Sequence, residues 1–146
     1  IIHSTPLTGT TYDISAMISS EDDRSGTADD VYVQIFGTTG TTEELMCPSG
    51  TFDVSPGATV TCTVTSTIDI GDYTCVTWRL DGTDGLQIAE FTTSVDGVVQ
   101  GAATPTDGWL DNDDVNSYYG NNGLTATWCT GIEIYCDLLW AMLNYI

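Results

Sequence analysis

Apolar residues occupy every second position in several stretches of this chain, and this alternation limits the possible folds more than any other feature. Tyr12, Ile14, Ala16 and Ile18 are one such series. Successive side chains of a β-strand point to opposite faces, so a period of two predicts strands with one buried face. The same pattern recurs in residues 31–36, 59–65, 75–80 and 86–91.

Residues that favour turns separate these stretches. Gly, Asp and Pro cluster at residues 37–40, 48–50, 56–57, 81–85 and 96–97. Many short strands separated by turns predict an all-β fold, an antiparallel β-sandwich of the jelly-roll kind. The 146 residues suit one domain of this type. Only residues 136–146 have a pattern compatible with a helix.

The chain is strongly acidic. It has 21 Asp and Glu residues against Arg24 and Arg79, no lysine, and a formal net charge of -19. Such a charge disfavours binding to nucleic acid, and to an anionic membrane unless a cation bridges the two. It suits divalent cations, cationic partners or extracellular surroundings, while solubility alone is the simpler explanation.

The five cysteines do not have the spacing of a zinc site, and the chain has too few histidines to complete one. We therefore expect disulfides, formed in an oxidising compartment. Cys129 and Cys136, which are close in sequence, are the favoured pair, and the pairing of Cys47, Cys62 and Cys75 is left open. The chain has no initiator Met, no signal peptide and no long apolar run, so we expect a processed, secreted protein.

Threonine is unusually frequent, with 25 residues that form runs such as 38–42 and 59–67. It is β-branched and favours strands. Exposed threonines are also candidate acceptors for O-linked glycans, whereas no sequon for N-linked glycans is present.

Both ends of the chain are apolar. We divide it into an N-terminal arm (1–10), a sandwich domain (11–112) and a C-terminal extension (113–146), which packs on the sandwich or on a neighbour. Apolar ends either complete their own core or insert into another subunit, where an extended arm can add a strand to a sheet edge. The residues expected at such an assembly interface are Ile1, Ile2, Leu7, Leu138, Leu139, Trp140, Met142, Leu143 and Ile146.

Four motifs resemble the PLAT domain, also called the lipoxygenase-homology domain, over residues 11 to about 112. Residues 25–37 (Ser-Gly-Thr-Ala-Asp-Asp-Val-Tyr-Val-Gln-Ile-Phe-Gly) are similar to its Gly-Thr, acidic, Val-Tyr strand pattern. Phe52 and Gly57 fall where the family places an aromatic residue and a turn glycine. Residues 70–82 resemble its strand ending at Asp, and Trp109-Leu110 resembles its terminal Trp-Leu. The resemblance implies a β-sandwich that binds lipids or proteins.

The resemblance also implies a calcium site, because loops of PLAT-like members can converge on this ion. Asp30 and Asp81 match those positions best, and Asp29 and Asp84 lie beside them. Calcium prefers six to eight oxygen ligands on flexible loops. The alternative is that these aspartates are simply solvated, and no cofactor is required.

Catalysis is not expected. A nucleophilic triad could use only His3, and the absence of lysine excludes Schiff-base chemistry. Trp78 lies in a predicted strand and is assigned to the core. Other aromatic residues crowd the last third of the chain, where they form either a second core layer or a surface for sugars or subunits. These are Trp109, Tyr118, Tyr119, Trp128, Tyr135 and Trp140.

Three functions remain open. The first is a non-catalytic extracellular structural subunit that associates with copies of itself, as a filament or surface layer, through its apolar ends. The second is a calcium-dependent, PLAT-like module for lipid or protein, and the third is a carbohydrate-binding module.

Overall fold

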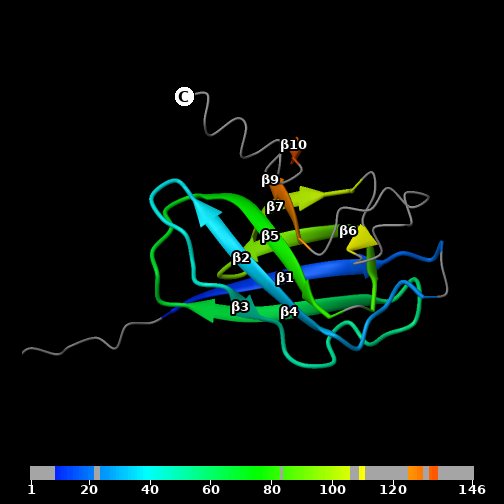
Figure 1. The fold of residues 1–146 in the computed structure, drawn as a ribbon. Helices are drawn as coiled ribbons and strands as arrows, with labels where there is room; N and C mark the ends of the chain where they lie inside the picture. Colours follow the sequence, from blue (N-terminus) through cyan, green and yellow to red (C-terminus); the bar gives the residue numbers. More distant parts are fainter. Residues whose placement is uncertain are drawn as a thin grey trace, which may run out of the picture.

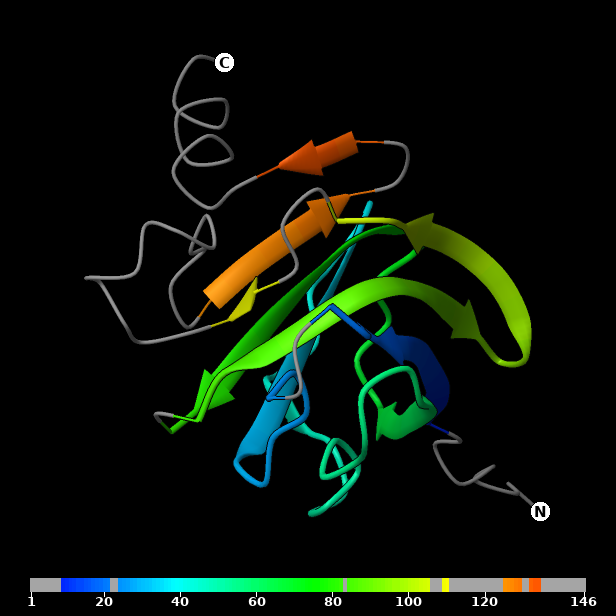
Figure 2. The ribbon, with the colours of Figure 1, turned by 90° about the vertical axis from the view of Figure 1, so that its right-hand side faces the viewer.

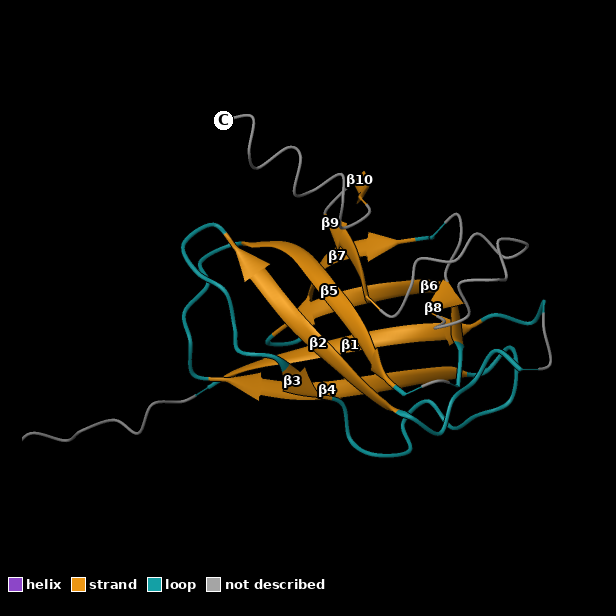
Figure 3. Ribbon diagram, in the orientation of Figure 1, coloured by secondary structure: helices purple, strands orange, loops and turns teal. Residues whose placement is uncertain are grey.

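The computed structural model describes residues 9–21, 24–82, 84–105, 109–110, 125–129 and 132–134, and these residues form strands and loops without a helix (Figure 3). The fold class predicted from the alternation is confirmed. The strands are β1 (Thr10–Ile18), β2 (Asp30–Gly37), β3 (Leu45–Met46), β4 (Thr59–Ser66), β5 (Tyr73–Asp81), β6 (Leu86–Val95), β7 (Val98–Ala103), β8 (Trp109–Leu110), β9 (Thr125–Cys129) and β10 (Ile132–Ile134).

The strands form two antiparallel sheets that pack face to face. Sheet A has the order β4-β1-β6-β7, with β8 also paired to β6, and sheet B has the order β10-β9-β5-β2-β3. The strands of the two sheets cross obliquely (Figure 1), and the turned view separates the two layers (Figure 2). Sheet B continues past residue 112, because β9 and β10 come from the stretch that we had assigned to a C-terminal extension.

The predicted buried faces are observed in β1, β2, β4 and β5. In β6 the alternation is interrupted, because Gln87 and Phe91 are buried together with Leu86 and Ile88, beside a register shift in the β1–β6 pairing. In β1, Tyr12, Ile14, Ala16 and Ile18 are buried, while the residues between them are half-buried on the outer face. Trp78 of β5 is completely buried, which confirms its assignment to the core.

An edge-to-face row of four aromatic rings joins the two sheets. Trp78 lies 5.6 Å from Phe52 and 5.2 Å from Phe91, and Phe91 lies 5.6 Å from Trp128, measured between ring centroids. Trp128 is thus part of the core. Of the other late aromatic residues, Trp109 belongs to β8, and Tyr118, Tyr119, Tyr135 and Trp140 lie outside the described residues.

The β6–β7 hairpin shows how local chemistry determines a connection. Asp96 and Gly97 have positive φ angles of 48° and 85°, the conformation that a two-residue type I′ turn requires. Asp96 Oδ1 accepts a hydrogen bond from the Thr11 N–H at 3.0 Å, and the Asp96 N–H donates to the Thr11 carbonyl at 2.8 Å. Two hydrogen bonds therefore connect the turn of this hairpin to the beginning of β1.

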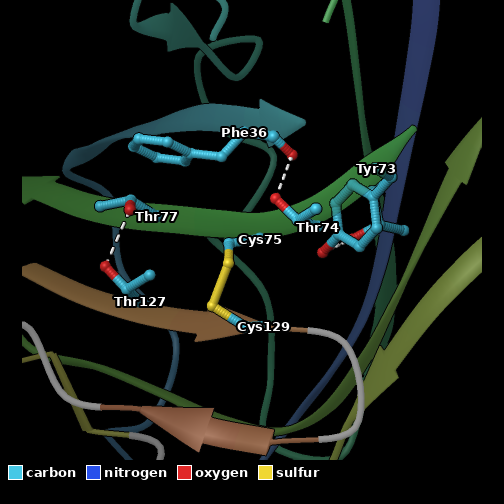
Figure 4. Close-up of a disulfide and its surroundings, with 8 residues drawn as sticks. Phe36, Tyr73, Thr74, Cys75, Thr77, Thr127 and Cys129 are labelled. Carbon is cyan, nitrogen blue, oxygen red and sulfur yellow. Dashed lines mark hydrogen bonds between the residues drawn. A yellow bond between two sulfur atoms is a disulfide. The ribbon is translucent and has the colours of Figure 1, made fainter. Parts of the chain in front are cut away.

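Two disulfides join strands that are distant in sequence. Cys47 pairs with Cys62, and Cys75 pairs with Cys129. The predicted Cys129–Cys136 pair is therefore wrong. Cys75 and Cys129 lie directly opposite each other in the β5–β9 register, and two residues further along the Thr77 and Thr127 hydroxyls hydrogen-bond at 2.8 Å (Figure 4). Strand register, rather than closeness in sequence, selects the partner of Cys129.

Several expectations concern residues that the structure does not describe. They are the possible helix at 136–146, residues 1–8 of the N-terminal arm with His3, and the assembly residues Ile1, Ile2, Leu7, Leu138, Leu139, Trp140, Met142, Leu143 and Ile146. No helix in the described residues is long and apolar enough to cross a membrane.

Candidate functional site

The acidic loops at one end of the sandwich come together because β2 and β5 are antiparallel neighbours. Their register places Asp30 directly opposite Asp81. Asp29 precedes Asp30 on the loop that enters β2, and Asp84 follows Asp81 in the turn between β5 and β6. The structure therefore brings all four predicted site residues to the same end of the molecule, which we call the acidic end (Asp29, Asp30, Asp81 and Asp84).

Hydrogen bonds tie the two loops of the acidic end. Asp29 Oδ2 accepts the Asp84 N–H at 2.7 Å, and Asp84 Oδ2 accepts the Ala28 N–H at 3.3 Å. The Thr27 hydroxyl lies 2.9 Å from the Asp84 carbonyl and accepts the Asp29 N–H at 3.1 Å. Thr27 is a central member of this network that the sequence analysis did not single out.

Gly82 allows the close approach of the two loops. Its φ angle is 151°, a backbone conformation that side chains disfavour. A Cβ atom at this position would overlap the Asp29 carboxylate. Gly82 therefore has two reasons to be glycine, its backbone conformation and its contact with Asp29, and the sequence pattern does not reveal the second.

The acidic end has the kinds of oxygen atom that bind calcium, but its carboxylates are not gathered around one point as in a calcium site. Carboxylate and carbonyl oxygens are the protein ligands that calcium prefers. In the described stretches, however, no three Asp, Glu, His or Cys side chains lie close enough together to hold one metal ion. Oxygens of Asp29 and Asp84 are instead engaged by backbone N–H groups.

One of the two arginines lies beside this end. Arg79 donates to Glu44 through Nε at 2.8 Å and through Nη2 at 2.6 Å, and its Nη1 lies 3.6 Å from Asp81. Its guanidinium also stacks 4.3 Å above the centre of the Tyr32 ring. The hydrogen bond from Arg79 lowers the pKa of Glu44 from its ordinary value. The positive charge of Arg79 is thus compensated by Glu44 and Asp81 of the same chain.

A shallow hollow of about 240 Å³ lies on the outer face of sheet A. Residues of β1, β4, β6 and β7 line it, and Ser15, Thr59 and Thr92 among them carry hydroxyl groups. Of the aromatic residues proposed for sugar stacking, Trp128 is buried in the core and does not line this hollow.

Comparison with known families identifies the domain type. The model of the PLAT/LH2 domain matches residues 12–119. This stretch contains all four motifs on which the resemblance was based, so the resemblance is confirmed. No curated protein matches the chain in sequence.

Solved structures give the same fold. A lipoxygenase variant, Delta413-417:GS LOX, superposes with a TM-score of 0.67 and 15% identity over 93% of this chain and 19% of its own. Coral 8R-lipoxygenase, described as activated by calcium via a C2-like domain, has a TM-score of 0.58 and 18% identity over 68% of this chain and 15% of its own.

A bacterial toxin shares the fold as well. Clostridium perfringens alpha-toxin has a TM-score of 0.56 and 18% identity over 88% of this chain and 33% of its own. At these identities the likeness concerns the fold alone. The chain spans a third or less of each of these three proteins.

Proposed function

Because the chain belongs to the PLAT/LH2 domain family, we propose that it is an extracellular docking module that binds a protein partner, including copies of itself. A PLAT domain alone is non-catalytic and binds lipid or protein. The family match over residues 12–119 is the observation that carries the proposal. Two disulfides support an oxidising environment outside the cell.

The charge narrows the class of partner. A net charge of -19 repels nucleic acid and anionic lipid. Arg79 offers little compensation, because Glu44 and Asp81 already pair with it. A neutral protein surface or a cationic one therefore suits this domain better than an anionic membrane.

Self-association as a filament or a layer remains part of the proposal. We expect sedimentation velocity on the 146-residue chain to show a species of at least twice the 15.6 kDa chain mass. The fraction of this species should grow with salt, because screening weakens the repulsion between two acidic copies. A single species of one chain mass at every protein and salt concentration would contradict self-association.

A calcium-dependent mode is the second candidate, and the pairing of Asp30 with Asp81 favours it. Asp29, Asp30, Asp81 and Asp84 are the residues that would hold the ion. Because the Asp29 and Asp84 carboxylates engage backbone N–H groups, binding would require those hydrogen bonds to rearrange. Calcium would then neutralise part of the acidic end and permit contact with an anionic headgroup.

Calcium titration tests this second candidate. We expect calorimetry to give a dissociation constant of about 0.1–1 mM, the range of extracellular modules. About 10 mM calcium should then stabilise the fold by roughly 1.4–2.7 kcal/mol. Asp81→Asn should abolish the binding heat, whereas Asp72→Asn, which makes the same charge change at the other end of β5, should preserve it. A flat titration of the unaltered chain removes the calcium mode and leaves the docking proposal intact.

A further inference from the structure

Among the described strands, β4 lies at one edge of sheet A and has unusual properties for an edge strand. It has eight residues, Thr-Val-Thr-Cys-Thr-Val-Thr-Ser, without a charge or a proline. Its eight pairs with β1 run without a bulge. In the described part of the chain, no strand pairs with its other side.

Edge strands of soluble proteins are normally protected by shortness, charge, proline or a bulge, because an unprotected edge pairs with other chains. The other edge strands described here follow this rule. β3 has two residues, β10 has three and contains Glu133, and the pairing of β7 with β6 is interrupted between Thr93 and Ser94. β4 alone is long, uncharged and regular.

The hydrogen-bond pattern identifies the backbone groups that face this open edge. The Ile18 N–H donates to the Ala58 carbonyl on the β4 side, whereas the Thr11 carbonyl accepts from Asp96 on the β6 side. Bonding in an antiparallel pair alternates residue by residue. Even-numbered residues of β1 therefore bond toward β4, and their partners are Val60, Cys62, Val64 and Ser66. It follows that Thr61, Thr63 and Thr65 direct their N–H and C=O groups outward.

The segment that contains β4 is uncharged, which favours a close approach by another acidic chain. Residues 54–68 contain no charged residue, although the chain carries a net charge of -19. On the neighbouring strand β1, the Asp13 carboxylate accepts a hydrogen bond from the Thr63 hydroxyl at 2.6 Å. The threonine side chains of β4 are exposed on its outer face. β3 lies at the same border of the sandwich (Figure 1), where Met46 is 46% exposed and Cys47 is bonded to Cys62 of β4.

We propose that the β4 edge binds the β4 edge of a second copy of this chain in an antiparallel manner, which joins two A sheets into one continuous sheet. Thr63 would face its own counterpart on a two-fold axis, and Thr61 would face Thr65 of the second copy. Such a contact is self-complementary, and it pairs threonine with threonine across the strands. This inference rests on the proposed self-association and names the surface of a dimer, because a two-fold contact closes on itself and a filament or layer needs a second contact.

Hydrogen exchange at low and high protein concentration tests this surface in the unaltered chain. The amides of Thr61, Thr63 and Thr65 should exchange at least about tenfold more slowly at high concentration, because they gain a partner only in the dimer. The amides of Val60, Cys62 and Val64 already bond to β1 and serve as internal controls. Their exchange should change much less.

A matched pair of variants provides the second test. Thr61→Pro removes an outward N–H that no bond to β1 needs, and proline is tolerated on an edge strand in this orientation. It should abolish the dimer, while Thr61→Ala, which keeps the N–H, should retain it. If Thr61→Pro fails to fold, the exchange measurement decides alone.

The outcomes separate the two proposals. A chain that stays monomeric at all concentrations overturns self-association and the β4 contact together. An oligomer in which the β4 amides are unprotected, and which survives Thr61→Pro, overturns only the β4 contact and leaves association through other segments.

Discussion

Replacing Trp78 with alanine should lower the free energy of unfolding by about 3–5 kcal/mol, the cost of removing a large buried aromatic side chain. Trp78 is fully buried, and its ring contacts Phe52 and Phe91 edge to face. The substitution would leave a cavity in the centre of the aromatic row that joins the two sheets. Denaturant unfolding followed by far-UV circular dichroism measures the loss.

Trp78→Phe is the informative companion variant. Within the described residues the indole Nε1 of Trp78 has no hydrogen-bond partner, so this substitution removes ring volume but no hydrogen bond. It should cost less than half as much as alanine. Val98→Ala, at a side chain that is 60% exposed, should change stability by no more than about 0.5 kcal/mol. Equal losses for Trp78→Ala and Val98→Ala would contradict the central role of the aromatic row.

Removing the Cys75–Cys129 disulfide is the second change with a large expected effect. The two residues are 54 apart in sequence, and closing a loop of that length in the unfolded chain is worth about 4 kcal/mol in the chain-entropy description. The double variant Cys75→Ala/Cys129→Ala should lose about this amount. The Cys47–Cys62 disulfide closes a loop of only 15 residues, so the variant Cys47→Ala/Cys62→Ala should lose about 3 kcal/mol.

Peptide mapping of the unreduced protein checks the pairing itself. Proteolysis followed by mass spectrometry should recover Cys47 linked to Cys62 and Cys75 linked to Cys129. Recovery of Cys129 linked to Cys136 would contradict the observed pairing and restore the one favoured by closeness in sequence.

Local patterns in the sequence were sufficient for the strand faces of β1, β2, β4 and β5, but not for β6, where the alternation is interrupted beside a register shift. The alternation at Tyr12, Ile14, Ala16 and Ile18 identified the buried side of β1, because side-chain direction in a strand depends on nothing beyond neighbouring residues. The Asp-Gly turn at 96–97 was equally readable, because a type I′ turn selects residues that tolerate positive φ.

The candidate site was only partly predictable. Family resemblance pointed to Asp30 and Asp81, which are indeed opposite each other. The roles of Thr27 and Gly82 were missed, because each is defined by a contact with the opposing loop. A threonine or a glycine in a loop carries no sequence signal that tells such a contact from an ordinary turn.

The sequence by itself determined that this chain forms an antiparallel sandwich with an acidic surface, because period-two patterning and charge are properties of neighbouring residues and of composition. Only the tertiary structure decided the partner of Cys129, the membership of β9 in sheet B and the position of β4 at an open edge. Each of these depends on which distant strands pair and in what register. Many pairings bury the same apolar faces, and packing of the whole core selects one among them.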